Sequence, residues 1–438
     1  MSSPSTDPSG PRDRERGRAE PVTPASRTGR ARGWRLRLIA VLAVMGPGLL
    51  AGLSDDDPAG ITTYSTLGAE YGYQLLWVLL LSTIALVLFH DLAARMGVVT
   101  GQGLIGLVRQ RFGVRVASLA LLVLVVANLG TTAAEFAGIA AGFELFGVSR
   151  YLSVPIAAIT VSYLVLRGSF HRVEHVLLAL GAVFVTYVVA AFLAHPDWSA
   201  AARGLVIPSM PLDKTALVLA TATVGTTLAP WGLSFIQSYA VDKKLTTDDL
   251  RYERVDVVTG AVLTGVIGAF VVIACAATLH ASGLQIETAA DAAQALQPLA
   301  GELASTLFAV GLIGAAILAA SILPLSTSYS VCEFVGTDAA LDDTFGQAKL
   351  FYVAYGITTV VAAGIVLIPG APLIPILVLT QALNAVLLLP LLLLMYLMAC
   401  DPDLMGAFRA GRVERGAYLV TMAFISVCVL ALGVLAFS

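Results

Sequence analysis

Residues 54–60 read Ser-Asp-Asp-Asp-Pro-Ala-Gly and directly follow the apolar run 38–53. A carboxylate near the middle of a bilayer costs several kcal/mol, so an acid within a spanning segment is a candidate functional group. Pro58 has no N–H and disfavours helical backbone at Asp57. The stretch therefore predicts a spanning helix that is interrupted at Asp57. We expect the Asp57 carboxylate to face a binding site and its backbone carbonyl to be free for a cation.

The three consecutive acids cannot all face one site. We expect Asp57 to point inward, and Asp55 and Asp56 to line the entry or to hold water. The alternative is that all three lie in a surface loop between two short helices.

The composition places the whole chain in a membrane. Of the 438 residues, 58% are hydrophobic and 13% are charged, about half the charged share of an ordinary soluble domain. The four cysteines stand apart from one another, which argues against paired metal thiolates and against a disulfide framework. We therefore expect an all-α polytopic membrane protein.

About eleven apolar segments are long enough to cross a hydrocarbon core. Residues 1–36 are rich in Arg, Ser, Pro and Gly and predict a disordered basic tail, whereas 37–438 form the transmembrane domain. The expected spans are 38–70, 74–95, 116–143, 151–166, 173–194, 215–241, 255–281, 300–335, 347–368, 372–398 and 416–437.

The basic residues predict the orientation. With the N-terminus in the cytoplasm, only Arg150, Arg203 and Lys214 of the 26 lysine and arginine residues lie outside. Cytoplasmic loops carry the excess of positive charge. We therefore expect a cytoplasmic N-terminus, an external C-terminus and a bacterial inner membrane.

A second interruption resembles the first. Ala229-Pro230-Trp231-Gly232 repeats the P-x-G pattern of Asp57-Pro58-Ala59-Gly60, about five spans later. An odd spacing inserts the two halves with opposite orientation, so 38–194 and 215–398 are predicted to be inverted repeats. Broken helices at matching positions of two halves point to a transporter's binding site.

Several blocks, in order, resemble the Nramp divalent-metal transporter family: 46–48 (Gly-Pro-Gly), 72–77 (Gly-Tyr-Gln-Leu-Leu-Trp), 92–101 (Leu-Ala-Ala-Arg-Met-Gly-Val-Val-Thr-Gly) and 196–208. The resemblance implies a leucine-transporter-type fold, with spans 1–5 and 6–10 as inverted repeats and an eleventh helix. It also implies a metal site between the broken helices 1 and 6.

The departures from the family pattern concern the metal ligands. The family's first motif is D-P-G-N, and here Gly60 takes the place of the Asn; its second motif is M-P-H, and here Ala229 takes the place of the Met. Oxygen-only sites suit Mg²⁺, Ca²⁺ and Mn²⁺, and Mg²⁺ is usually bound with several waters retained. The smaller Gly60 and Ala229 leave room for a partly hydrated ion, as in the Nramp-related magnesium transporters. The remaining candidate oxygen ligands are the Asp57 carboxylate, main-chain carbonyls near Asp57 and Thr226, the Thr226 and Thr227 hydroxyls, and the Gln381 amide.

The residues that resemble the family's proton pathway are altered as well. Trp231 takes the place of the M-P-H histidine, and Thr132 takes that of an aspartate on span 3; only Glu135 matches. Because a proton relay needs titratable groups, we expect transport without proton coupling. Glu135 either assists the ion pathway or pairs with Arg95. Glu333 is interpreted as a cytoplasmic helix-end acid, with a gate as the alternative.

The expected function is thus secondary transport of a divalent cation, Mg²⁺ first and Mn²⁺ second, with no resident cofactor, no catalytic activity and no obligatory protein partner. The alternatives are a proton-coupled Mn²⁺/Fe²⁺ transporter and an amino-acid carrier of the same fold. His171-Arg172-Val173-Glu174-His175 matches the H-x-x-E-H pattern of a metalloprotease, a remote alternative. We find no Walker motif, phosphate-binding glycine loop or nucleic-acid module.

Overall fold

The computed structural model describes residues 51–52, 54–166, 186–211, 213–337 and 345–437. Every regular element in these ranges is a helix, which agrees with the predicted all-α class. The basic tail lies outside the described residues and stays a prediction. So does the H-x-x-E-H motif, which falls within 167–185.

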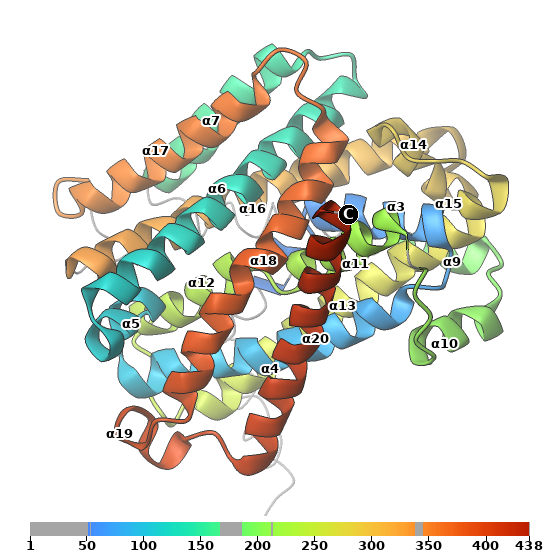
Figure 1. Cartoon of the computed structure of the whole chain (residues 1–438). Coiled ribbons are helices and arrows are strands. Elements are labelled where there is room, and N and C mark those ends of the chain that lie inside the picture. Colours follow the sequence, from blue (N-terminus) through green and yellow to red (C-terminus); the bar gives the residue numbers. More distant parts are fainter. Residues whose placement is uncertain (1–50, 53, 167–185, 212, 338–344, 438) are drawn as a thin grey trace, which may run out of the picture. The chain divides into compact units, whose positions relative to one another are not determined.

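The helices follow the predicted spans closely (Figure 1). The long ones are α4 (Leu76–Thr100), α6 (Val114–Glu144), α7 (Arg150–Leu166), α13 (Leu250–Thr278), α16 (Ala304–Val335), α17 (Lys349–Val366), α18 (Leu373–Ala399) and α20 (Arg412–Phe437). The interrupted spans give α3 (Pro58–Tyr71), α11 (Lys214–Thr227) and α12 (Pro230–Asp242). Shorter helices are α5 (Leu104–Phe112), α9 (Thr186–Leu193), α10 (Trp198–Val206), α14 (Ala289–Ala293), α15 (Gln297–Ala300) and α19 (Pro402–Met405).

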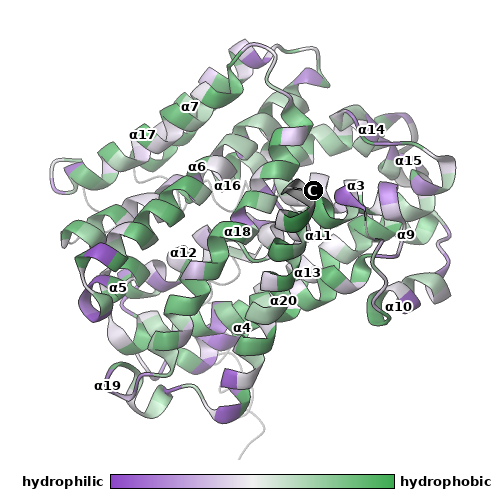
Figure 2. Cartoon of the chain, in the orientation of Figure 1, coloured by the Kyte–Doolittle hydropathy of each residue, from purple (hydrophilic) through white to green (hydrophobic). Residues whose placement is uncertain are grey.

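The described helices identify an integral membrane protein. Eight of them, counting α11 with α12 as one, are long and apolar enough to cross a bilayer. The 17-residue α7 is also apolar, and α3 and α9 are the described parts of the predicted first and fifth spans. Figure 2 shows hydrophobic residues along the long helices and hydrophilic ones near helix ends and in connecting elements such as α5 and α10.

Both predicted interruptions are present. Residues 54–55 are helical, Asp57 is extended (φ −77°, ψ 171°), and α3 begins at Pro58. In the second span α11 ends at Thr227, Ala229 is extended (φ −87°, ψ 144°), and α12 begins at Pro230. Proline suits the first helical position because its missing N–H would be unpaired there in any case. The alternative prediction, that the three acids lie in a surface loop, is wrong because Asp55, Asp56 and Asp57 are only 2–4% exposed.

The packing of the helices repeats between the two halves. The half-helix α3 packs against α13, and its counterpart α12 packs against α4. Helix α6 packs against α16 and α17, while α16 packs in turn against α7. Figure 1 shows α17 beside α7 and α16 beside α6. In an inverted repeat, a helix of one half contacts a helix of the other half, and their two counterparts make the equivalent contact. These contacts show that pattern and place the two interruptions in the middle of the helices.

The contact between α11 and α18 gives a stability prediction. A Cβ added at Gly225 would clash with the Gln381 carbonyl, whereas a Cβ at Gly356 on α17 would meet nothing within 4 Å. Overpacking costs about 1–3 kcal/mol. We expect Gly225→Ala to lower the melting temperature of the detergent-purified protein and Gly356→Ala to leave it unchanged or raise it slightly. Equal melting temperatures for the two variants would contradict this packing.

Candidate metal-binding site

The first interruption is held by its own aspartate. Asp57 is the N-cap of α3, and its Oδ1 accepts a hydrogen bond from the Gly60 N–H at 2.6 Å. An anionic cap at a helix N-terminus is favoured by both the unpaired N–H groups and the helix dipole. The backbone carbonyl of Asp57 accepts from the Ile61 N–H at 2.9 Å. The expectation of a free carbonyl at Asp57 was therefore wrong, because that oxygen makes the first helical hydrogen bond of α3.

The second interruption leaves oxygen atoms available. Pro230 stands four residues after Thr226 and has no N–H, so the Thr226 carbonyl has no helical donor. Ala229, the N-cap of α12, has no side chain that could cap the helix. The Thr226 hydroxyl oxygen is buried and has no hydrogen-bond partner among the residues that the structure describes.

The two interruptions meet at Gly60. A Cβ added there would lie 2.7 Å from the Asp55 carbonyl oxygen, 3.2 Å from the Thr226 Oγ1 and 3.3 Å from the Asp57 Oδ1. Three oxygen atoms, one of them from the other half of the molecule, thus surround one point. A side chain at residue 60 would crowd these oxygens, so only glycine lets the two interruptions approach this closely. That Gly60 also provides room for an ion stays a prediction.

Glu135 joins this group from α6. Its carboxyl group is fully buried and lies beside that of Asp57, close enough for the two to repel each other when both are charged and to share a hydrogen bond when one is protonated. Gly138, one turn later, packs directly on Pro58 and fixes that approach. The alternative pair with Arg95 is wrong, because Arg95 binds Glu414 at 3.1 Å and the Tyr418 hydroxyl at 2.9 Å.

Thr227 and Gln381 are engaged in contacts of their own. The Thr227 hydroxyl donates to the Thr223 carbonyl at 2.7 Å and lies 2.9 Å from the Tyr64 hydroxyl, which ties α11 to α3. The Gln381 Oε1 accepts from the Asn384 amide at 2.9 Å, and Asn384 also donates to Thr131 on α6 at 2.8 Å. Both residues support the walls of the site, and their role as ligands stays a prediction.

The other two acids do not converge with Asp57. Asp55 and Asp56 are buried and their charges repel that of Asp57, and neither oxygen of the Asp56 carboxylate accepts a hydrogen bond in the part of the chain that is described. Among the described residues, no three His, Cys, Asp or Glu side chains are arranged to hold one metal ion. An ion at this site would therefore depend on main-chain and hydroxyl oxygens or on its own waters.

Trp231 and Thr132 are buried, and each takes part in a hydrogen bond, Trp231 with α16 and Thr132 within α6. The Trp231 carbonyl accepts from the Ser326 hydroxyl at 3.1 Å, and the Thr132 hydroxyl donates to the Asn128 carbonyl at 2.7 Å. Neither side chain can titrate in the physiological range.

Sequence reasoning missed one motif. Residues 101–106 read Gly-Gln-Gly-Leu-Ile-Gly, the spacing G-x-G-x-x-G, and they open α5. The expectation that the chain has no phosphate-binding glycine loop stays a prediction, because the partner of this loop is part of the protein itself. The loop holds an internal carboxylate, that of Glu333, whose Oε2 accepts from the Ile105 N–H at 3.1 Å.

The family follows from a comparison with known families. The model of the family "Natural resistance-associated macrophage protein-like" matches residues 48–435. The chain belongs to the Nramp family. This match spans both interruptions and every long helix described above.

Bacterial Nramp proteins are among the chain's relatives. It is 29% identical over 403 residues to the divalent metal cation transporter MntH of Granulibacter bethesdensis, covering 88% of this chain and 86% of the relative. It is 31% identical over 309 residues to MntH of Burkholderia ambifaria, covering 68% and 70%. The fold matches a crystal structure of the Eremococcus coleocola manganese transporter, with a TM-score of 0.72, 20% identity, and coverage of 93% and 88%. This agrees with the leucine-transporter-type architecture expected from the sequence.

The cap at Asp57 allows charge and helix geometry to be tested separately. Asparagine caps helices about as well as aspartate does, so Asp57→Asn keeps the start of α3 and removes the charge. We expect Asp57→Asn to reduce divalent-cation uptake into liposomes about a hundredfold or more while the protein stays folded.

Asp213 provides the matched control, since it caps α11 through the Ala216 N–H at 2.9 Å. The hydrogen bond from Tyr71, helped by that of Ala216, lowers the pKa of Asp213, so the control also removes an ionised carboxylate. Asp213→Asn should transport normally. Equal uptake by Asp57→Asn and the unmodified protein would contradict the site.

Proposed function

We propose that the chain is a secondary transporter of divalent cations, with Mg²⁺ as its main substrate and Mn²⁺ as a second. The observation that carries this proposal is that the Asp57 carboxylate, the Asp55 carbonyl and the Thr226 hydroxyl lie close together around Gly60, which has no side chain. These are oxygen ligands only, which is the set that hard cations prefer. The names of the relatives support transport over catalysis and over amino-acid carriage.

Preference for Mg²⁺ is supported by the oxygen ligands and by the lack of sulfur. Ala229 stands at the second interruption with no heteroatom in its side chain, so no thioether is available there to favour softer ions. Mg²⁺ retains several waters when it is bound. A site with one capping carboxylate and with hydroxyl and carbonyl oxygens suits an ion bound partly through its waters.

Transport without protons follows from the same region. Trp231 and Thr132 cannot relay protons, and a divalent ion crossing about 100 mV gains about 4.6 kcal/mol from the potential alone, at about 2.3 kcal/mol per charge. The membrane potential therefore suffices for accumulation.

Proton-coupled Mn²⁺ transport is the second candidate. It is favoured by the names of the relatives and of the matched structure, and by the buried Glu135 carboxyl group beside Asp57. Uptake driven by a proton gradient would use Glu135 as a titratable partner of Asp57.

The two candidates differ in their effect on internal pH. We expect purified protein in liposomes to take up Mg²⁺ down a potassium-diffusion potential with no matching acidification, and Mn²⁺ to compete with Mg²⁺ better than Cd²⁺ does. Liposomes with the Asp57→Asn variant serve as the control for leak. Stoichiometric acidification, or uptake of Mn²⁺ with none of Mg²⁺, would favour the second candidate.

Ala229→Met tests the ligand chemistry. The added thioether narrows the site and supplies a soft ligand, so we expect Cd²⁺ to inhibit Mg²⁺ uptake at a concentration lower by about tenfold or more. The measurement is the half-inhibitory Cd²⁺ concentration in the liposome assay. An unchanged value would place residue 229 outside the ion's reach.

The membrane and orientation also belong to the proposal. The distribution of lysine and arginine supports a cytoplasmic N-terminus, and the bacterial relatives support the plasma membrane.

A further inference from the structure

The inner half-helix α12 is joined to α16 by a series of hydrogen bonds. From the interruption inward, Ser326 donates to the Trp231 carbonyl at 3.1 Å, and the Ser234 and Ser330 hydroxyls lie 2.8 Å apart. Ser238 then donates to the Glu333 Oε1 at 2.5 Å, and Tyr329 donates to the Asp242 Oδ2 at 2.7 Å. The residues on α12 are three or four positions apart and so share one face. We call these four contacts the inner ladder.

The inner ladder begins beside the ion site. Its first member, Trp231, follows Pro230 at the second interruption, and Ser326 lies within 3.4 Å of the Asn128 amide on α6. At 1.5 Å per residue, Ser238 lies about 10 Å further along α12. The ladder therefore runs from the interruption to the inner end of the half-helix.

Glu333 extends the ladder to a third helix. Its second carboxylate oxygen accepts from the Ile105 N–H, in the first turn of α5. The N-cap of α5 is Gly103, which has no side chain to cap the helix, so Glu333 caps it from α16. Hydrogen bonds to a charged group are about twice as strong as neutral ones. One carboxylate thus joins α5, α12 and α16.

Gly103 is the residue that admits this carboxylate. Its backbone (φ −73°, ψ 168°) is open to any amino acid, yet a Cβ there would overlap the Glu333 carboxylate. The glycine is required by the carboxylate alone. This explains the second glycine of the G-x-G-x-x-G pattern as part of a site for an internal anion, whereas the first, Gly101, ends α4 with a positive φ of 63°.

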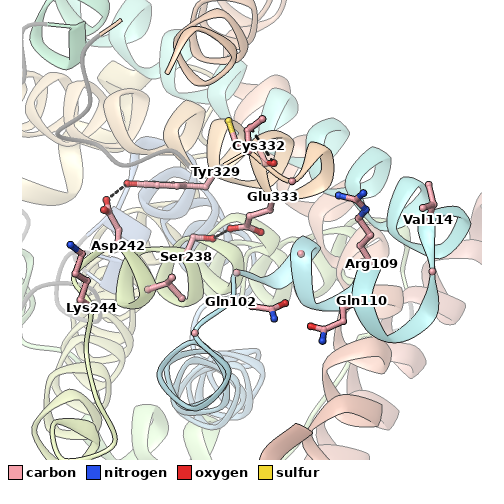
Figure 3. Close-up of a pocket in the computed structure, with 17 residues that line it drawn as sticks. Gln102, Arg109, Gln110, Val114, Ser238, Asp242, Lys244, Tyr329, Cys332 and Glu333 are labelled. Atoms are coloured by element: carbon pink, nitrogen blue, oxygen red, sulfur yellow. Dashed lines mark hydrogen bonds between the residues drawn. The ribbon is translucent and has the colours of Figure 1, made fainter. Parts of the chain in front are cut away.

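A cavity of about 720 Å³ lies directly against this contact. It is lined by Gln102, Arg109, Ser238, Asp242, Tyr329 and Glu333, among others, and Figure 3 shows Glu333 pointing to Ser238 at its wall. The ion-site residues Asp57 and Thr226 are only 3–4% exposed, so the site is closed while the ladder is formed.

We propose that Glu333 is the latch of the inner gate: its carboxylate holds α12 against α16 and α5, and its release opens the ion site towards this cavity. The proposal rests on the transport function above. In folds of this type, one bundle rocks against another around a fixed site. Movement of α12 away from α16 requires the Ser238 contact to break, and loss of the carboxylate removes the Ser238 and Ile105 contacts together because both end on it. Glu333 is a positioning residue, since it acts on the ion site through α12.

The native Cys332 reports on the latch. Its side chain lines the same cavity and is only 3% exposed. The experiment uses the full chain in detergent, with Cys275, Cys400 and Cys428 replaced by alanine and no divalent metal added. The rate of Cys332 modification by a water-soluble maleimide is compared among Glu333→Gln, Gly103→Ala and the control Gln110→Ala. Gln110 lines the cavity but lies outside the latch.

We expect both latch variants to be modified about tenfold faster or more, as the loss of a charged hydrogen bond implies, and Gln110→Ala to be modified at the parent rate. A change at residue 333 could alter the reactivity of the adjacent Cys332 thiol directly, whereas Gly103→Ala displaces the carboxylate without changing any residue next to the cysteine. A purely local effect on the thiol would therefore speed modification in Glu333→Gln but not in Gly103→Ala. A folded Gly103→Ala or Glu333→Gln protein that is modified at the parent rate overturns the proposal. Because no metal is present, the modification rates do not depend on which ion the protein transports. If Mg²⁺ uptake fails while both latch variants are modified faster, the result counts against the proposed function alone.

Discussion

A carboxylate buried at the centre of the helices is the constraint on which the site depends. Asp57 meets it by capping α3, so that the Gly60 N–H and the helix dipole stabilise its charge. This is feasible only where a helix starts inside the protein, and Pro58 makes it start there. The interruption, the charge and the proline are therefore one feature, and losing any one of them removes the reason for the other two.

The second interruption supplies what the first lacks. Because Pro230 has no N–H, the Thr226 carbonyl has no helical donor, and the Thr226 hydroxyl lies beside Gly60, which has no side chain. The surrounding contacts hold this geometry rigidly: Tyr64 joins α3 to α11, and Asn384 joins α18 to α6. Towards the other end of α12 the same principle recurs in another form, because Glu333 caps α5 from a different helix. A carboxylate at a helix start thus acts both at the ion site and at the proposed gate.

The sequence predicted most of the fold and part of the site. Apolar length and the two P-x-G breaks located the helices to within a few residues, because hydrophobic thickness and the missing proline N–H act locally. The partner of Arg95 was not predictable, since Glu414 lies far along the chain and only packing brings α20 beside α4. The carbonyl of Asp57 was misjudged, because a residue before proline can still accept the first hydrogen bond of the following helix. The loop at Gly103 was missed because its anion comes from α16.

The most direct measurement of the central claim is the position of a bound ion. Crystals of the full chain soaked with Mn²⁺, a substitute for Mg²⁺ that scatters anomalously, locate the ion without reference to transport. The account predicts one anomalous peak between the two interruptions, next to the Asp57 carboxylate and the Thr226 oxygens, with water completing its shell. A fully occupied peak elsewhere, with ordered protein and no signal at the interruptions, would contradict it.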